Sequence, residues 1–197
     1  MESLQKIDIK IFELINSLAG NIRIADEIIL IFANDYFVPV SIGLIFLFHW
    51  VGFSNTHSKI QSQRSVLKSI IIMVISNMII LALNQIIFRE RPFEATDVNL
   101  LFYMPTDSSF PSNACAGSIS LALGFLSKKW IRTFLIISLL AILMSLSRIY
   151  VGIHYPSDIA GGVLVAFISY FIGNYIWKYS TKIQLKSIRA LEYINMA

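Results

Sequence analysis

The feature that most constrains this chain is a series of apolar stretches long enough to cross a lipid bilayer. A helical span needs about 20 predominantly apolar residues. Only 14% of the 197 residues are charged, whereas a soluble domain carries about 25%. We therefore expect an integral membrane protein of the all-α class, a polytopic transmembrane helix bundle of five to six spans. The clearest predicted spans are residues 36–53, 66–88, 110–126, 131–150 and 156–177.

More polar segments flank the predicted bundle at both ends. The sequence predicts N-terminal amphipathic and interfacial helices in residues 1–35, a membrane domain in 36–177, and a basic cytoplasmic amphipathic tail in 178–197. A helix with one apolar face and one charged face lies in the membrane interface rather than across it. The residues predicted to form the apolar face of the first helix are Leu4, Ile7, Ile11, Leu14 and Leu18.

Basic residues divide the predicted loops between the two sides of the membrane. Lysines and arginines occur in residues 54–65 and around Lys128, and alternating spans bring these segments to one side. An excess of Lys and Arg marks the cytoplasmic side, so residues 89–108 and 151–155 share the extracytoplasmic face. The net charge of +4 is explained by this topology, and no nucleic-acid partner is expected.

A set of ionisable residues lies between the last two predicted spans. Ser147 and Arg148 are followed by His154 after five residues and by Asp158 after three more. An arginine offers a forked donor to phosphate, an imidazole can attack phosphorus, and a carboxylate can orient the imidazole. The pattern indicates phosphoryl transfer with His154 as nucleophile and Asp158 as its partner, without a metal or other cofactor.

Two further segments are predicted to meet this one at the extracytoplasmic face. Arg91 ends the second span, and Ser112 and Asn113 begin the third, where helix N–H groups can bind an anion. We therefore expect the phosphate to be bound by Arg91, Ser112, Asn113 and Arg148. Possible substrate contacts are Asn84, Arg89, Glu90, Pro111 and Ser147.

These three segments resemble the motifs of the type 2 phosphatidic acid phosphatase superfamily of membrane lipid phosphatases. The family pattern is Lys-x6-Arg-Pro, then Pro-Ser-x-His, then Ser-Arg-x5-His-x3-Asp. The third motif is complete at residues 147–158, and the first retains Arg-Pro at residues 91–92 with Asn84 in place of the lysine. The second retains Pro-Ser at residues 111–112 with Ala114 in place of the histidine.

A finer resemblance is to the bacterial undecaprenyl pyrophosphate phosphatases of this superfamily, which share an Arg-Pro-Phe signature and a Ser-Phe-Pro-Ser string. It implies hydrolysis of undecaprenyl diphosphate to the monophosphate at the outer face of the bacterial cell membrane. That reaction recycles the lipid carrier for peptidoglycan and cell-wall synthesis. The implied partners are the polyprenyl lipid and the bilayer, and the sequence does not indicate an oligomeric state.

Ala114 is the serious departure from the family pattern. In the family this histidine protonates the leaving oxygen, and losing a general acid costs about a hundredfold to ten-thousandfold in rate. An engineered His→Ala change and a naturally degenerate site both explain it, and the intact neighbouring motifs favour the first.

Two other functions stay open: a broader lipid phosphate phosphatase acting on phosphatidic acid or phosphatidylglycerol phosphate, and a non-catalytic lipid-phosphate binder or transporter. Asp107 is expected to be a turn residue.

Overall fold

The structure is a computed structural model that describes residues 2–179, and all the regular elements in this part are helices. The predicted all-α class is therefore confirmed. The predicted basic tail lies outside the described residues from residue 180 onward. The helices are α1 Glu2–Asn16, α2 Arg23–Ala33, α3 Phe37–Val51, α4 Thr56–Asn84, α5 Pro92–Ala95, α6 Asn113–Leu123, α7 Ile131–Tyr150 and α8 Pro156–Tyr179.

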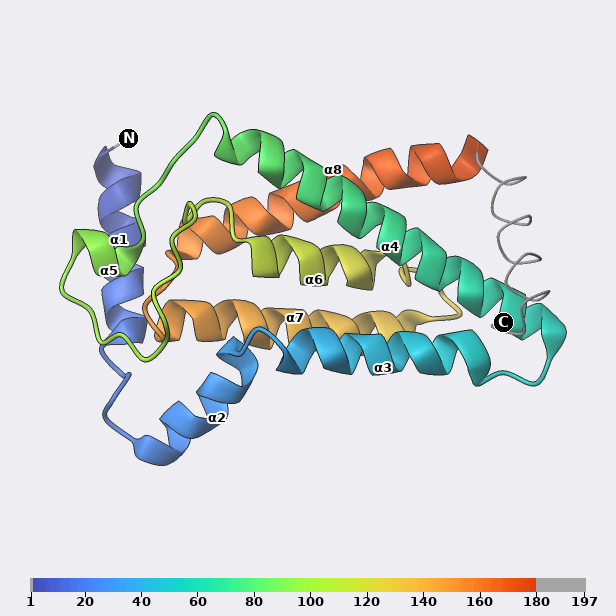
Figure 1. Ribbon diagram of the computed structural model, residues 1–197, viewed down its shortest axis with the longest axis horizontal. Helices are drawn as coiled ribbons and strands as arrows, with labels where there is room; N and C mark the ends of the chain where they lie inside the picture. The colour runs from blue at the N-terminus through green and yellow to red at the C-terminus, as the bar shows by residue number, and fades with distance from the viewer. Residues whose placement is uncertain (1, 180–197) are drawn as a thin grey trace.

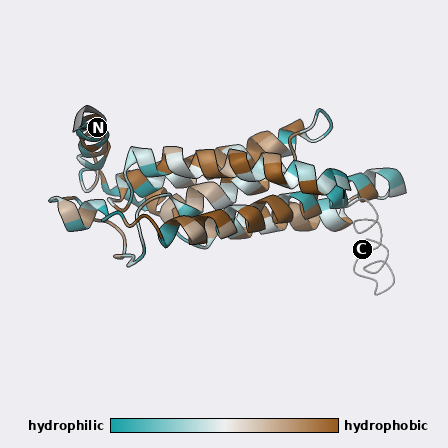
Figure 2. Cartoon of the chain, turned by 90° about the horizontal axis from the view of Figure 1, so that it is seen from above, coloured by the Kyte–Doolittle hydropathy of each residue, from teal (hydrophilic) through white to brown (hydrophobic). Residues whose placement is uncertain are grey.

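An elongated bundle is formed by helices that run roughly along one direction, namely α3, α4, α6, α7 and α8 (Figure 1). Its central member is α6, which contacts α4, α7 and α8, while α3 packs on α4 and α7. The helices α1, α2 and α5 lie at one end of this bundle. Hydrophobic residues predominate along the middle of the bundle and hydrophilic residues toward its two ends, as Figure 2 shows.

Three helices, α4, α7 and α8, are each long and apolar enough to cross a membrane. A fourth crossing results if α2 and α3 form one span that is broken and bent by 53°. The predicted span at 110–126 is shorter in the structure, since α6 has 11 residues. Such a helix is about 16 Å long, less than the hydrocarbon thickness of about 30 Å, and α4, α7 and α8 surround it.

The predicted span at 66–88 also has different bounds, because α4 begins at Thr56 and ends at Asn84. Its early start has a local cause: the side chain of Asn55 accepts from the N–H of Ser58 at 3.1 Å, an N-cap that satisfies an otherwise unpaired donor. The chain beyond Asn84 is then free of regular structure until α5, and this irregular stretch carries Arg89 and Arg91 into the functional end.

Close packing between α6 and α8 depends on a glycine. A Cβ atom at Gly162 would lie 2.8 Å from the carbonyl oxygen of Ser112 and 3.0 Å from the Cβ of Cys115. Small residues permit such a close approach between membrane helices. This contact brings the start of α6 against the first turns of α8.

The N-terminal helix packs with the opposite face from the one that its apolar stripe suggests. Ile7, Ile11 and Leu14 are exposed, whereas Asp8, Phe12 and Asn16 are buried. An exposed apolar face suits a helix that lies at the surface of a bilayer, and the interfacial position of this helix stays a prediction. Asp8 and Asn16 are thereby turned toward the protein, at the same end of the bundle as α5.

Candidate active site

Three chain segments meet at the end of the bundle next to α1 (Figure 1). Nη1 of Arg91, just before α5, donates to the carbonyl of Ile153 at 2.8 Å and lies 3.4 Å from Nε2 of His154. The N–H of Ser112, just before α6, donates to the carbonyl of Asp158 at 3.0 Å. The motifs that the sequence predicts to converge therefore lie together around the turn between α7 and α8.

His154 is buried in that turn, with its two ring nitrogens in different surroundings. Gly152 adopts a φ of 90°, a left-handed conformation that glycine adopts readily, and so reverses the chain ahead of the histidine. Nδ1 of His154 lies 3.5 Å from Oδ2 of Asp158, one helical turn further on. When the proton of the neutral ring is on Nδ1 and points to this carboxylate, the free lone pair is on Nε2. Nε2 lies on the side of Arg91.

The surroundings of His154 favour its neutral form. Burial lowers the pKa of this imidazole below the ordinary value of 6.5, and the positive charges of Arg91 and Arg148 act in the same direction. The hydrogen bond to Asp158 acts in the opposite direction. An uncharged imidazole is the form that can act as a nucleophile.

Asp158 is completely buried and holds several donors at once. It accepts from Nη1 of Arg89 at 2.6 Å, from Oγ of Ser109 at 2.6 Å and from the N–H of Tyr155 at 2.7 Å. Nη2 of Arg89 also donates to Asp8 of α1 at 2.8 Å, and its guanidinium lies 4.1 Å from the ring centre of Tyr155. Arg89, predicted as a possible substrate contact, is thus placed behind the histidine as a partner of Asp158.

A cavity of about 310 Å³ lies beside His154. Four other predicted site residues line its wall, namely Arg91, Asn113, Ala114 and Arg148. The wall is completed by residues from the break between α2 and α3 and from the loop before α6, among them Asp35, Tyr103 and Asp107.

Both arginines of this cavity are paired with carboxylates. Nη2 of Arg91 donates to Asp107 at 2.8 Å, and Nη2 of Arg148 donates to Asp35. The arginine side chains are only 4% and 6% exposed, whereas those of Asp107 and Asp35 are 53% and 40% exposed. The cations are therefore fixed within the wall, and their anionic partners stand on its open side, where another anion can replace them.

Six of the predicted contacts do not line this cavity. The hydroxyl of Ser147 donates back to the carbonyl of Met144 within α7, and Oγ of Ser112 and Oδ1 of Asn84 are buried without a hydrogen-bond partner in the described residues. Glu90 is exposed and Pro111 is buried. The predicted contacts outside the cavity lining are Asn84, Arg89, Glu90, Pro111, Ser112 and Ser147.

The structure also adds residues that the sequence analysis did not assign to the site. Asp35 pairs with Arg148 and accepts from the hydroxyl of Tyr103 at 2.8 Å, and Asp8 reaches the site from α1. Asp107, expected to be a turn residue, is the partner of Arg91. The signal for Asp35 was present, because a carboxylate within an apolar stretch is costly and commonly functional. Among residues 2–179, no three His, Cys, Asp or Glu side chains are grouped to hold a metal ion.

Comparison with known proteins agrees with this arrangement. The chain is 34% identical over 165 residues to undecaprenyl-diphosphatase BcrC of Bacillus subtilis, covering 83% of this chain and 80% of that relative. The structure is similar to that of Aquifex aeolicus LpxE, with a TM-score of 0.67 and 25% identity over 86% of this chain and 95% of the other.

The crystal structure of a PAP2 type phosphatidylglycerolphosphate phosphatase from Bacillus subtilis shares the fold, with a TM-score of 0.63 and 21% identity over 91% of this chain and 88% of that one. Residues 65–182 match the family model of the PAP2 superfamily. On the sequence match, the shared fold and the clustered motifs, the chain belongs to the PAP2 superfamily, a family of membrane hydrolases that act on phosphate esters.

Proposed function

We propose that this protein removes the terminal phosphate of a polyprenyl diphosphate through a phosphohistidine at His154. The observation that carries the proposal is the position of this imidazole: Nε2 faces the arginine side of the cavity, and Asp158 stands behind Nδ1. The two buried arginines of the cavity wall, Arg91 and Arg148, supply the charge that phosphoryl transfer requires.

The reaction proceeds in two displacements. Nε2 of His154 attacks the terminal phosphorus, the bond from that phosphorus to the bridging oxygen breaks, and the lipid monophosphate leaves with the electron pair. Water then attacks the phosphohistidine, the N–P bond breaks with its electron pair returning to Nε2, and the product leaves as dihydrogen phosphate, which carries both protons of the water. During both steps Arg91 and Arg148 exchange Asp107 and Asp35 for the phosphoryl oxygens, which binds the developing charge in a buried setting.

The relatives support the substrate class. BcrC is named an undecaprenyl-diphosphatase, and its match covers most of both chains. An aromatic wall next to the arginines suits an isoprenoid chain: the Phe102 ring centre lies 5.1 Å from the guanidinium carbon of Arg148, and Tyr103 lines the cavity. Phosphatidic acid and phosphatidylglycerol phosphate present the same terminal phosphate and are the alternative substrates.

We further propose that the cavity opens on the extracytoplasmic face of a bacterial cell membrane. The start of α4, the turn between α6 and α7, and the start of α7 carry Lys59, Lys128 and Arg132, respectively. These segments lie at the opposite end of the bundle, and an excess of such residues favours the cytoplasmic side. The lipid would then reach the site from the outer leaflet.

Ala114 sets the rate of the first displacement in this proposal. It lines the cavity, but a methyl group has no proton for the leaving oxygen. A diphosphate leaves as a phosphate monoester, which needs less help from an acid than an alkoxide does. Tyr103 contributes a hydroxyl to the same wall, and burial together with the hydrogen bond to Asp35 raises its pKa, so it stays protonated. Its hydroxyl is already engaged by Asp35.

The same alanine favours a second candidate, a protein that binds a lipid phosphate without hydrolysing it. This candidate keeps both arginine pairs and the cavity but has no turnover. The two functions make different predictions for a chain in which the family's histidine is restored.

The deciding experiment is phosphate release from undecaprenyl diphosphate by the purified chain and by its Ala114→His variant. A phosphatase gains about a hundredfold to ten-thousandfold on restoring the acid, and an acid-labile phosphohistidine accumulates when the reaction is quenched early. No release by either protein from this lipid or from phosphatidic acid, combined with saturable binding of undecaprenyl phosphate, establishes the binder instead.

A further inference from the structure

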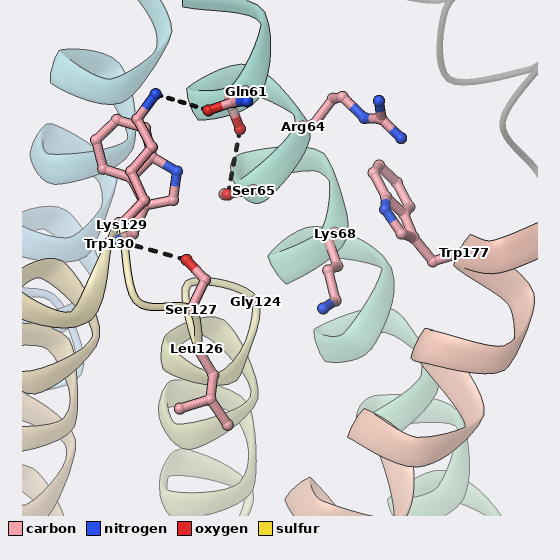
Figure 3. A pocket seen from close by; sticks show the side chains of 10 residues that line it. All are labelled: Gln61, Arg64, Ser65, Lys68, Gly124, Leu126, Ser127, Lys129, Trp130 and Trp177. Carbon is pink, nitrogen blue, oxygen red and sulfur yellow. Dashed lines mark hydrogen bonds between the residues drawn. The ribbon is translucent and has the colours of Figure 1, made fainter. Parts of the chain in front are cut away.

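A second polar cavity lies at the end of the bundle away from His154. It has a volume of about 350 Å³ and is formed by α4, the turn between α6 and α7, and the end of α8. Figure 3 shows the cationic and indole side chains that line it, which are Arg64, Lys68, Lys129, Trp130 and Trp177. One helix, α7, runs from this cavity to the catalytic one, and its 20 residues separate the two by about 30 Å.

The elements around this cavity carry positive charges and no carboxylate. Residues 36–89, 108–157 and 159–179 contain no Asp or Glu, so α4, the α6–α7 turn and this part of α8 have no acidic side chain to offer. At the catalytic end, in contrast, Arg91 and Arg148 each have a carboxylate partner.

Lys68 is the clearest sign that a ligand is expected here. It is half-buried on α4, and within residues 2–179 its Nζ has no hydrogen bond or ion pair, its contact being the ring of Tyr170 at 5.3 Å from the centroid. Figure 3 shows its side chain between the turn that carries Gly124 and Trp177. A half-buried ammonium group without hydrogen-bond acceptors is unfavourable, and an anion in the cavity would supply them.

Lys129 faces the same cavity from the other side. Its Nζ donates to Oε1 of Gln61 at 2.6 Å and to Oγ of Ser58 at 3.3 Å, and it lies 4.9 Å from the ring centre of Trp130. Neutral oxygens thus orient this ammonium group without cancelling its charge. Two cations are held on opposite sides of one cavity.

Indole rings place the cavity at the level of lipid headgroups. Trp130 and Trp177 line it from α7 and α8, and tryptophan is enriched where the acyl chains meet the headgroups. Leu126 lines the cavity and is exposed. Polar donors inside the cavity and an apolar side chain at its rim match a phospholipid, with its phosphate inside and its chains outside.

We propose that this cavity binds the phosphate of an anionic phospholipid from the leaflet opposite the catalytic site. Lys68 and Lys129 would bind the phosphate oxygens, with Arg64 as a further wall residue. The proposed lipid site takes no part in phosphoryl transfer. This proposal is therefore independent of whether the chain hydrolyses a lipid diphosphate.

The test compares lipid preference in bilayers of phosphatidylcholine that contain brominated phosphatidylglycerol or brominated phosphatidylcholine, with quenching of tryptophan fluorescence as the readout. The double variant Lys68→Gln/Lys129→Gln removes two cavity cations. The matched control Lys128→Gln/Arg132→Gln removes two exposed cations from the same end that do not line the cavity. A third variant, Lys68→Arg/Lys129→Arg, keeps both charges.

We expect the preference of the native chain for phosphatidylglycerol to fall about tenfold in the double Gln variant and to survive in the double Arg variant and largely in the control. Equal losses in the cavity variant and the control would overturn the proposal, because they would reflect surface charge alone. Two further results would also overturn it: no preference in the native chain, or binding of inorganic phosphate with no preference for the anionic lipid. Phosphate release by the Ala114→His chain in phosphatidylcholine should not change in any of these variants.

Discussion

The two ends of the bundle carry similar cations in opposite electrostatic settings. At the catalytic end Arg89, Arg91 and Arg148 each contact a carboxylate. At the other end Lys68 and Lys129 face a cavity whose surrounding elements contain no carboxylate.

The difference fits the two kinds of anion that we propose for the two cavities. A buried arginine needs a partner while its ligand is absent, since an unpaired buried charge is strongly unfavourable. Asp107 and Asp35 are such partners, and they are exposed enough for an anionic ligand to take their place. Lysines near the membrane surface are screened by water and satisfied by lipid headgroups, which are always present. Four measurements test this difference between the two ends, from the largest expected effect to the smallest.

The largest effect is expected at His154, which has no counterpart in the other cavity. In the Ala114→His background, His154→Ala should lower phosphate release at least about a thousandfold, because the covalent route is lost, and the phosphoenzyme should disappear. The control is His57→Ala in the same background, which changes an exposed histidine at the opposite end. This variant should release phosphate at the same rate as the Ala114→His chain. A His154→Ala protein that still accumulates phosphoenzyme would remove His154 from the nucleophile role.

The second-largest effect is expected at Asp8, the carboxylate of α1 that lies behind the histidine. Asp8 accepts from Arg89 and from the N–H of Ser157 at 2.8 Å, so it ties α1 to Asp158. Asp8→Asn should lower kcat about tenfold, the equivalent of about 1.4 kcal/mol for a charged hydrogen bond. Glu13→Gln, an exposed change on the same helix, serves as the control. Equal rates in the two variants would mean that α1 contributes only to lipid contact.

A smaller effect should appear when a cavity carboxylate is neutralised. Asp35→Asn removes the negative charge beside Arg148, so inorganic phosphate should inhibit about fivefold more strongly, as expected for about 1 kcal/mol of lost competition. Asp107→Asn should act in the same direction on Arg91. Asp97→Asn, in the same loop but away from the cavity, should leave the inhibition constant unchanged. Weaker inhibition in Asp35→Asn would show that Asp35 holds Arg148 in place rather than competing with the anion.

The smallest effect concerns pH. Because burial and the nearby arginines lower the pKa of His154 below 6.5, the reactive neutral form persists as the pH falls through 6.5 and is lost only at more acidic values. NMR titration of the three histidines, with the His154 signals identified by their loss in His154→Ala, should show this. A midpoint above 6.5 would mean that Asp158 outweighs burial.

Much of the site could be predicted from the sequence because its motifs are local. The spacing from Arg148 to Asp158 lies within one helix end, one turn and one helix start, so the geometry follows from helix periodicity. The meeting of this motif with Arg91 and Ser112 followed from alternating spans. Asp35 could not be paired with Arg148 in this way, since the two lie 113 positions apart.

The fold shows the same division. Apolar length predicted α4, α7 and α8, but not that α6 would be a short central helix. On α1 the apolar stripe predicted the interfacial position, but it did not show that Asp8 and Asn16 would face the protein. The surface of a membrane protein that faces lipid is apolar. Polar residues of such a helix therefore face the protein where polar partners are available there.

Hydropathy and spacing within short segments are sufficient to predict a helical membrane protein of the PAP2 type, with His154, Asp158, Arg91 and Arg148 grouped at one end of its bundle. The helix packing was needed to show which carboxylate lies by which arginine, which predicted contacts lie outside the cavity, and that a second cavity, with no carboxylate in its lining among residues 2–179, lies at the far end. Those features depend on pairs of residues distant in sequence, and packing of whole helices brings them together.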